Sequence, residues 1–349
     1  MGMKISSFGR LADGREAKLV TIANANGMSI EVTNYGATLV SAVMPDKNGH
    51  YADVILGYAD VTDYAKNGGY LGAVIGRNGN RIGGAAFKIN GITYELVKNE
   101  NGNNLHSGPD GYDTKIWDMK TDESSQSVEF SYHSPDMEQG FPGNFDVTVK
   151  YTLTDDNEIK ISYTGKSDKD TIANMTNHSY FNLEGHDSGS ILDHVLWIDA
   201  DAITAVDAES IPTGEIRPVE GTPFDFRQPK TIGRDIEMED DQLKKGGGYD
   251  HNFALNTDGT MKKIAEVTAP VSGRKMEVFT DCAGVQLYTG NFIEDSWTGK
   301  DGKAYGKRTG LCLETQFYPD AVNHENFASP VLKAGDIYET TTIYKFLVP

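Results

Sequence analysis

The amino-acid sequence predicts an all-β protein, a large antiparallel β-sandwich with few short helices. Runs of alternating apolar and polar residues recur along the chain, with Gly, Asn and Asp between them. Residues 61–66 and 231–243 suggest helices, and both segments are short. The 349 residues are 38% hydrophobic and contain no repeat and no Pro/Ser-rich linker. We therefore expect residues 1–349 to form a single domain with one sizeable core.

The expected strands can be assigned in order. Residues 28–44 alternate apolar and polar side chains, and Gly36 predicts a bulge or bend within them. Residues 85–97 predict a hairpin because Asn90-Gly91 suits a type I′ turn. A second hairpin is expected at residues 144–165, and further strands at residues 53–58, 194–203, 262–271, 275–280, 285–292, 311–316 and 338–346. Strands at this short spacing favour a sandwich or barrel.

Charge and composition exclude several classes of partner. Asp and Glu number 51 against 32 Lys and Arg, a net charge of −19, which repels nucleic-acid backbones and anionic lipid. No apolar run approaches the roughly 18–20 residues of a membrane helix. The N-terminus lacks an apolar signal core, so we expect a cytoplasmic protein, or an extracytoplasmic one if a signal sequence has been removed. Cys282 and Cys312 lie in apolar runs and predict small core residues.

Two polar segments hold candidate site residues. The segment NMTNHSYFNL centres on His178, and its neighbours Asn177, Ser179 and Tyr180 can fix the imidazole ring by hydrogen bonding. A structural histidine at a strand end is the alternative. The segment GRNGNRIGG, residues 76–84, offers Arg and Asn donors suited to a neutral polyhydroxyl ligand. It lacks the GxxxxGK[ST] pattern of a phosphate loop, and a solvated turn remains open.

Later segments add acidic and amide groups. The polar loop at residues 101–118 carries His106, and long loops in compact domains are usually functional or disordered. Asp250 follows three glycines, and Gln286 lies in a strand-like run. Glu314 is the most informative residue because LCLETQF places it on the strand face opposite two leucines. A carboxylate on so apolar a strand is costly unless it is paired or functional; an edge-strand surface glutamate is the alternative.

Metal and serine chemistry lack sequence support. The eight histidines show no HxH, HxxxH or HExxH spacing, and no GxSxG motif is present. We therefore expect neither a catalytic metal nor a nucleophilic serine, and no cofactor.

Together these segments resemble the aldose 1-epimerase (galactose mutarotase) family. The resemblance runs through TNYGATLVSAVMPD, GRNGNRIGGAAFKING, NNLHSGPDGYDTKIWD, GFPGNFDVTVKYTLTDDNEIKISY, NMTNHSYFNLEGH, GGYDHNFAL, GVQLYTGNF, LCLETQFYPDAVN and YETTTIYKF, nearly the whole chain. It implies the family's supersandwich fold and an isomerase that interconverts the α and β anomers of hexoses such as D-galactose and D-glucose. By the same resemblance His178 is the general acid and Glu314 the general base, and the sugar-binding residues are Asn80, Arg81, His106, Tyr180, Asp250 and Gln286. The sequence departs from the family at Gly79 and in NHENFASP, which lacks the usual prolines; both departures concern the rim of the site.

The implied mechanism needs one acid and one base. Glu314 takes the proton of the C1 hydroxyl while His178 protonates the ring oxygen. The ring opens, the C1–C2 bond rotates, and both transfers reverse. Each well-placed group contributes roughly 10²–10⁴-fold. Attraction between the two residues predicts a lowered pKa for Glu314 and a raised pKa for His178.

Other functions fit parts of the pattern. A glycosidase would use two carboxylates, for which Asp250 and Glu314 are candidates. A non-catalytic carbohydrate-binding domain of the same fold would not need the acid–base pair. A sugar-phosphate 1-epimerase would want a cluster of Lys or Arg, which this acidic chain does not display. The expected partner is a monosaccharide; the preferred hexose and the choice between monomer and dimer stay open.

Overall fold

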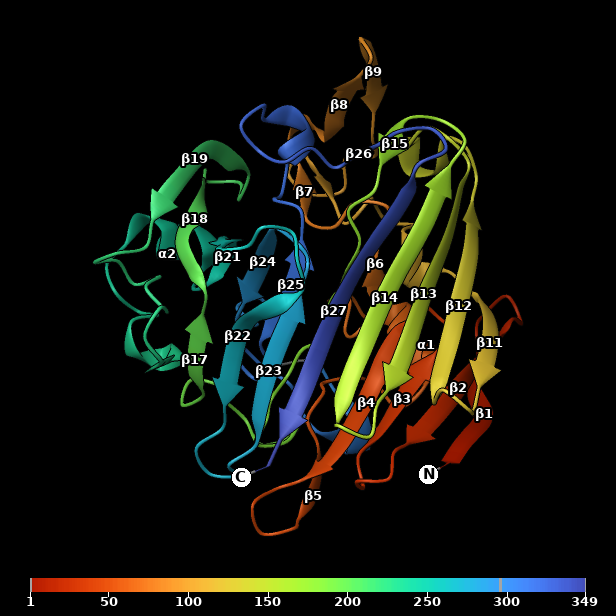
Figure 1. Ribbon diagram of the computed structural model, residues 1–349, viewed down its shortest axis with the longest axis vertical. Coiled ribbons are helices and arrows are strands. Elements are labelled where there is room, and N and C mark those ends of the chain that lie inside the picture. The colour runs from red at the N-terminus through yellow and green to blue at the C-terminus, as the bar shows by residue number, and fades with distance from the viewer. Residues whose placement is uncertain (1, 295–296, 349) are drawn as a thin grey trace.

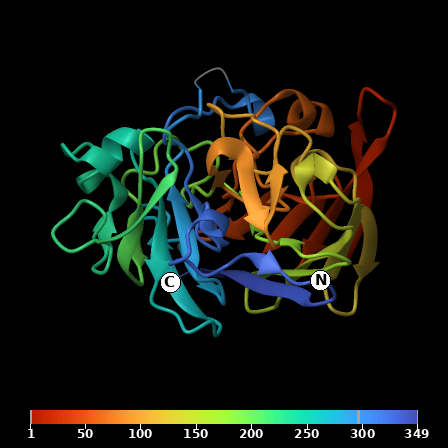
Figure 2. The same cartoon turned by 90° about the horizontal axis from the view of Figure 1, so that it is seen from above.

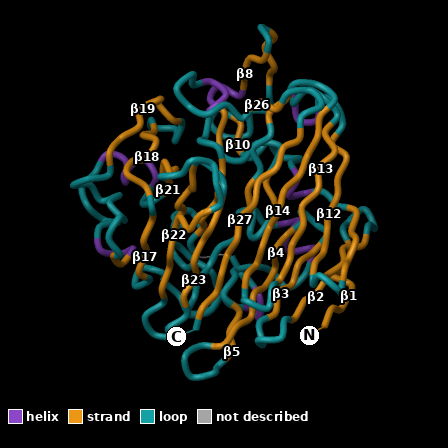
Figure 3. Tube along the Cα trace, in the orientation of Figure 1, coloured by secondary structure: helices purple, strands orange, loops and turns teal. Residues whose placement is uncertain are grey.

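The computed structural model describes residues 2–294 and 297–348, and Figure 1 shows their arrangement. Within these residues the strands form one nine-stranded sheet, two five-stranded sheets and four two-stranded ribbons. All of the paired strands are antiparallel. The predicted all-β antiparallel fold is confirmed, and strands dominate the whole trace in Figure 3.

The three large sheets account for most of the chain. The nine-stranded sheet consists, in order, of β11 (Asp118–Asp122), β12 (Ser127–Ser134), β13 (Phe145–Leu153), β14 (Glu158–Ser167), β27 (Ile337–Leu347), β23 (Lys275–Thr280), β22 (Lys262–Thr268), β17 (Val195–Ile198) and β20 (Lys230–Thr231). The N-terminal sheet consists of β1 (Gly2–Arg10), β2 (Glu16–Ala23), β3 (Ser29–Thr33), β4 (Thr38–Pro45) and β5 (Tyr51–Asp53). The other five-stranded sheet consists of β19 (Pro212–Pro218), β18 (Ala200–Val206), β21 (Asp250–Leu255), β24 (Gly284–Tyr288) and β25 (Cys312–Gln316).

Four short ribbons connect the loops around these sheets. They pair β7 (Arg81–Ile82) with β10 (Asn104–Leu105), β6 (Val74–Ile75) with β16 (Thr176–Asn177), β8 (Ala86–Ile89) with β9 (Ile92–Glu95), and β15 (Thr171–Ile172) with β26 (Val331–Leu332). In β8–β9, Asn90 and Gly91 both have positive φ, as a type I′ turn requires. The predicted hairpin is therefore confirmed.

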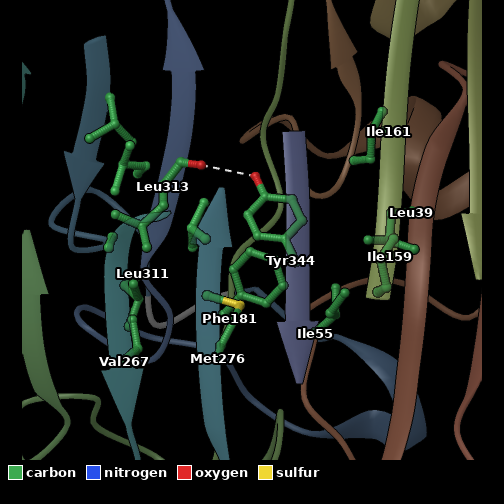
Figure 4. Close-up of a cluster of buried hydrophobic side chains, with 14 of the residues drawn as sticks. Leu39, Ile55, Ile159, Ile161, Phe181, Val267, Met276, Leu311, Leu313 and Tyr344 are labelled. Atoms are coloured by element: carbon green, nitrogen blue, oxygen red, sulfur yellow. Dashed lines mark hydrogen bonds between the residues drawn. The ribbon is translucent and has the colours of Figure 1, made fainter. Parts of the chain in front are cut away.

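The main core lies between the nine-stranded sheet and the two five-stranded sheets. Figure 2 shows the N-terminal strands (red) behind the strands of the large sheet. Along β13 and β14 buried residues alternate with more exposed ones, so each strand turns one face to the core. Figure 4 shows one contact across the layers, where the Tyr344 hydroxyl of β27 donates to the Leu313 carbonyl of β25 at 2.9 Å. The core cluster joins residues from all three sheets, among them Ile30, Ile161, Tyr344 and Leu313.

Two predicted strands are each divided in the structure. Residues 28–44 form β3 and β4, an antiparallel pair rather than one bulged strand. The chain reverses at Gly36, which has φ +64°, and a Cβ there would lie 2.5 Å from the Asp113 carbonyl oxygen. Only glycine fits such a close approach of backbones. Residues 194–203 divide between β17 and β18, which belong to different sheets.

The helices are few and short, as expected. Helix α1 (Val61–Lys66) coincides with the predicted segment, and its N-cap Asp60 accepts a hydrogen bond from the Thr62 amide. The prediction for residues 231–243 is wrong in extent, because a 3₁₀ turn (Ile232–Arg234) and helix α2 (Asp241–Gly246) lie there instead. No helix in the described ranges is long and apolar enough to cross a membrane.

Candidate active site

Three adjacent strands present a polar face that opposes the core. The register pairs Asp250 of β21 with Tyr288 of β24, and Tyr288 with Cys312 of β25. The next row along the strands consists of Asn252, Gln286 and Glu314. Cross-strand partners point to the same side, and so do residues two apart on a strand, so all six side chains share one face. Between the two rows, Leu287 and Leu313 belong to the main core, as do Phe253 and Val285 just beyond the second row, which confirms the predicted two-faced character of the Glu314 strand.

Two loops distant in sequence are joined beside this face. Strands β7 and β10 pair Arg81 with Leu105. Next to this ladder the His106 amide donates to the Asn80 carbonyl at 2.9 Å, and the Asn80 amide donates to His106 Nδ1 at 3.1 Å. The reciprocal bonds fix the His106 ring against the backbone of the Gly-rich segment. They explain why the two polar loops act as one unit.

The polar face and the joined loops enclose a cavity of about 490 Å³. Its lining includes seven of the eight predicted site residues: Asn80, Arg81, His106, His178, Tyr180, Asp250 and Glu314. The eighth, Gln286, lies outside the lining and donates from Nε2 to Asp250 Oδ1 at 2.8 Å. Gln286 therefore holds a lining residue rather than forming the cavity surface itself.

The two residues with predicted catalytic roles lie together in this cavity. His178 Nε2 is 3.7 Å from Glu314 Oε1, and their side chains are 6% and 3% exposed. The Glu314 Oε2 atom is buried and has no hydrogen-bond partner among the described residues. An acid–base pair held at this distance, with an unsatisfied carboxylate oxygen, is arranged to receive a polar ligand.

Aromatic rings surround the His178 imidazole. The ring stacks on Tyr180 and Tyr70, with centroids 5.0 and 5.8 Å away, and Cys312 Sγ lies 3.5 Å from Nδ1. Asn177 and Ser179 were expected to fix the ring, but their side chains bond to each other and to nearby backbone. The main chain of His178 is held by other segments: its amide donates to the Ala73 carbonyl and its carbonyl accepts from the Gly72 amide, each at 2.9 Å.

Burial dominates the protonation of the pair. Burial raises the pKa of the Glu314 carboxyl well above its usual range; the Asp250 charge raises it further and Arg81 opposes this. Burial lowers the pKa of His178 to about 4. The predicted directions are therefore wrong, because desolvation outweighs mutual attraction here. Between these two pKa values the pair holds one proton, which belongs to both residues as a coupled unit.

The surrounding charged residues are also paired. Arg81 forms a bidentate ion pair with Glu100, with nitrogen–oxygen distances of 2.6 and 2.7 Å. Burial raises the pKa of Asp250, while Arg81 and Gln286 oppose the rise. Arg81 thus stabilises negative charge on Asp250 and on Glu314, while its own position is fixed by Glu100.

A sequence profile described as Aldose 1-epimerase matches residues 18–345. The chain belongs to the aldose 1-epimerase family. Human galactose mutarotase is 41% identical over 341 residues, covering 98% of this chain and 97% of the relative. Aldose 1-epimerase from Haemophilus influenzae is 41% identical over 338 residues, covering 96% and 97%.

Solved structures from the aldose 1-epimerase family have the same fold. The crystal structure of galactose 1-epimerase from Lactobacillus acidophilus matches with a TM-score of 0.88 at 28% identity, covering 99% of this chain and 98% of that one. An aldose epimerase homologue from C. elegans matches with a TM-score of 0.86 at 29% identity, covering 95% and 100%. The predicted supersandwich fold is thus confirmed, and the chain is an isomerase that interconverts aldose anomers, not a non-catalytic binding domain.

Among the described residues, His106, His178 and Glu314 have ligand atoms within 4.8 Å of one another, a set that invites comparison with a metal site. The tautomer of His106 does not suit metal binding in this protein. Its Nδ1 accepts the Asn80 amide hydrogen, so in the neutral ring Nε2 carries the hydrogen. A metal-bound histidine instead donates from its other nitrogen. The arrangement suits donation to a sugar hydroxyl, and the absence of a metal stays a prediction.

Several residues that line the cavity were not identified from the sequence. Tyr70, Glu100, Tyr288, Phe292 and Trp297 all line the cavity. Tyr288 could have been found, because it lies two residues after Gln286 on the same strand face. Tyr70 and Glu100 carry no local signal, since both reach the site through loops.

The cavity backbone is conformationally strained. Tyr70, Asn80 and His106 have φ values of +57°, +57° and +52°, in the left-handed region. Such conformations cost about 1–3 kcal/mol for a residue other than glycine. Their concentration in one cavity of an aldose 1-epimerase indicates that the ligand-facing groups are pre-positioned.

Proposed function

We propose that the enzyme interconverts the α and β anomers of free hexoses such as galactose and glucose, with His178 as general acid and Glu314 as general base. The observation that carries this proposal is the buried His178 Nε2–Glu314 Oε1 pair, 3.7 Å apart within a polar cavity. The names of the human and L. acidophilus relatives, galactose mutarotase and galactose 1-epimerase, support galactose as a substrate.

The reaction conserves the single proton of the pair. Glu314 removes the C1 hydroxyl proton as His178 gives its proton to the ring oxygen, and the C1–O5 bond breaks. Rotation about C1–C2 exposes the other face of the aldehyde, and the reverse transfers close the ring. Arg81 opposes the rise of the Glu314 pKa that burial causes, and the reactive form of the one-proton pair is the one with the proton on His178 and Glu314 ionised. Each transfer contributes roughly 10²–10⁴-fold when the groups are aligned.

The remaining residues position the sugar. Burial, reinforced by His178 and Arg81, lowers the pKa of His106 well below its usual range, so its neutral ring donates one hydrogen bond. Asp250 accepts from sugar hydroxyls and is itself held by Gln286. Asn80 and Arg81 supply further donors, and Tyr180 packs on the acid. Fixed placement of this kind converts binding energy into alignment of C1 with the catalytic pair.

Cavity charge favours a neutral sugar over a sugar phosphate. The described lining contains two cationic side chains, Arg81 and Lys245. Arg81 is bound by Glu100, and Lys245 Nζ lies 3.2 Å from Asp241 and donates to the Val206 carbonyl. A phosphate would have to displace one of these partners while facing the carboxyl groups of the cavity.

Polarimetry on freshly dissolved α-galactose and α-glucose tests the reaction and the substrate preference together. Wild-type enzyme should speed the approach to the anomeric equilibrium for at least one sugar. Glu314→Gln should bind that sugar with an affinity within a few-fold of wild type, measured by calorimetry, and lose roughly 10²–10⁴-fold in rate. A variant that retains wild-type rates would refute the assignment of the base.

Two wider expectations accompany the proposed function. The family match to residues 18–345 and a main core that draws on residues from Val20 to Phe346 support a single domain over residues 1–349. The net charge of −19 supports the absence of nucleic acid and anionic membrane among the partners. The cytoplasmic location stays a prediction.

A further inference from the structure

A second cavity of about 240 Å³ adjoins the sugar cavity. Gly69 and Tyr70 line both, so Tyr70 forms part of the wall between them. The second cavity lies beside the end of α1, where the exposed residues Asn67 and Gly68 join its lining. Its volume far exceeds the roughly 30 Å³ share of one water molecule. The cavity is therefore large enough for a small organic molecule and has access to solvent.

Asp113 supplies a negative group to this second cavity. Its Oδ1 atom is buried and has no hydrogen-bond partner in the part of the chain that the structure describes. Among charged groups, Asp110 raises the pKa of Asp113 and Lys115 lowers it, and Lys115 Nζ is already 2.8 Å from Asp110 and 3.2 Å from Glu138. Within residues 2–294 and 297–348 no side chain hydrogen-bonds to this buried oxygen, and such a group calls for an explanation.

Tyrosines supply the other distinctive part of the lining. Tyr35, Tyr64 and Tyr70 all line the second cavity. Burial raises the pKa of the Tyr35 and Tyr70 hydroxyls, and the Asp113 charge contributes to both shifts. Tyrosine side chains that line a cavity together with a carboxyl group match the way proteins recognise ammonium cations.

The chemistry of the lining distinguishes between ligand classes. None of its residues in the described ranges is Lys or Arg, so an anion would meet only Asp113. A calcium ion needs six to eight oxygen ligands and magnesium an octahedral shell, whereas one carboxylate is present among the lining side chains. An organic cation requires a single counter-charge and aromatic contact, and both are available.

We propose that this cavity binds a small alkylammonium ion, with Asp113 as counter-ion and Tyr35, Tyr64 and Tyr70 as the aromatic walls. The ligand class is distinct from the sugar of the neighbouring site, and its binding does not depend on the anomerase reaction. Because burial raises the pKa of Asp113 to about 7, the cation displaces a proton from this group near neutral pH.

Calorimetry with choline and its uncharged isostere 3,3-dimethylbutan-1-ol tests the charge requirement on the whole chain. Choline should bind at least tenfold more tightly than the alcohol. Its affinity should rise about tenfold between pH 6 and pH 8, as the ionised fraction of Asp113 grows. Equal affinity for the two compounds would overturn the proposal.

Variants and competition locate the bound cation. Asp113→Asn should weaken choline binding at least tenfold while leaving sugar anomerisation unchanged, which also shows that the variant is folded. Tyr35→Leu provides an independent variant in the same wall and should weaken choline binding several-fold. Saturating galactose should leave choline bound; displacement by galactose, or undiminished binding by Asp113→Asn, would refute the assignment.

Discussion

The two neighbouring cavities each contain a carboxyl group with a buried oxygen, yet their other side chains support different chemistry. Glu314 stands on a strand of a five-stranded sheet, with the His178 ring 3.7 Å away. Asp113 lies in a 3₁₀ turn (Tyr112–Thr114) among tyrosines. Burial raises the pKa of both carboxyl groups, so burial alone does not make a catalyst. The sugar cavity differs because Glu314 has a second titratable group, His178, held at a fixed distance from it.

The largest effect should come from replacing His178 or Glu314, the acid–base pair of the sugar cavity, while the second cavity is left intact. His178→Asn and Glu314→Gln should each lower the anomerisation rate roughly 10²–10⁴-fold. The double variant should be little slower than the worse single variant, because the two residues act as a unit. Asp113→Asn is the matched control and should retain wild-type rates in the same polarimetric measurement. Losses that multiply in the double variant would show that the two residues act independently.

The pH dependence of the rate should reveal the same pair. Below the His178 pKa of about 4 the pair gains a second proton and loses its base. Above the raised pKa of Glu314 the pair loses its remaining proton and with it the acid. We expect a broad plateau across neutral pH, with the rate falling about tenfold per pH unit beyond each limb. An acid limb near the ordinary histidine value, about 6.5, would contradict the dominance of burial.

A smaller effect on the kinetic constants should follow from removing the hydrogen bond that positions Asp250 while His178 and Glu314 stay unchanged. Gln286→Leu removes the 2.8 Å hydrogen bond to Asp250 Oδ1. A hydrogen bond to a charged group contributes about 1.5–3 kcal/mol, so KM for the sugar should rise roughly 10- to 100-fold with a smaller change in kcat. Steady-state kinetics on both constants provides the measurement. An equal fall in kcat at constant KM would place Gln286 in the chemical step instead.

The smallest effect concerns stability and the other carboxyl group. The folded-state pKa of Asp113, about 7, exceeds its ordinary value of 3.8. The folded protein therefore retains a proton that the unfolded chain has lost, and stability falls as pH rises through this window. Asp113→Asn removes that dependence. The Tm of Asp113→Asn minus the Tm of wild type, measured by calorimetry, should therefore increase from pH 5 to pH 8. A Tm difference that stays constant over this range would show that Asp113 ionises normally.

The sequence by itself determined the all-β class, the hairpin at Asn90-Gly91 and the two faces of the Glu314 strand. These features follow from side-chain alternation and turn chemistry, which act over a few residues. Family motifs also named seven residues that line one cavity. Local patterns did not reveal that residues 28–44 turn back at Gly36, because the reason is a backbone 77 residues further on, at the Asp113 carbonyl.

Only the tertiary structure decided the distances and the protonation. His178 and Glu314 meet because Phe181 and Leu311 form a bridge between their segments, a contact between chain segments far apart in sequence. The directions of their pKa shifts were predicted wrongly because sequence shows which charges are present but not how much water is excluded around them. The wall at Tyr70 and the second cavity behind it likewise exist only where distant loops pack together.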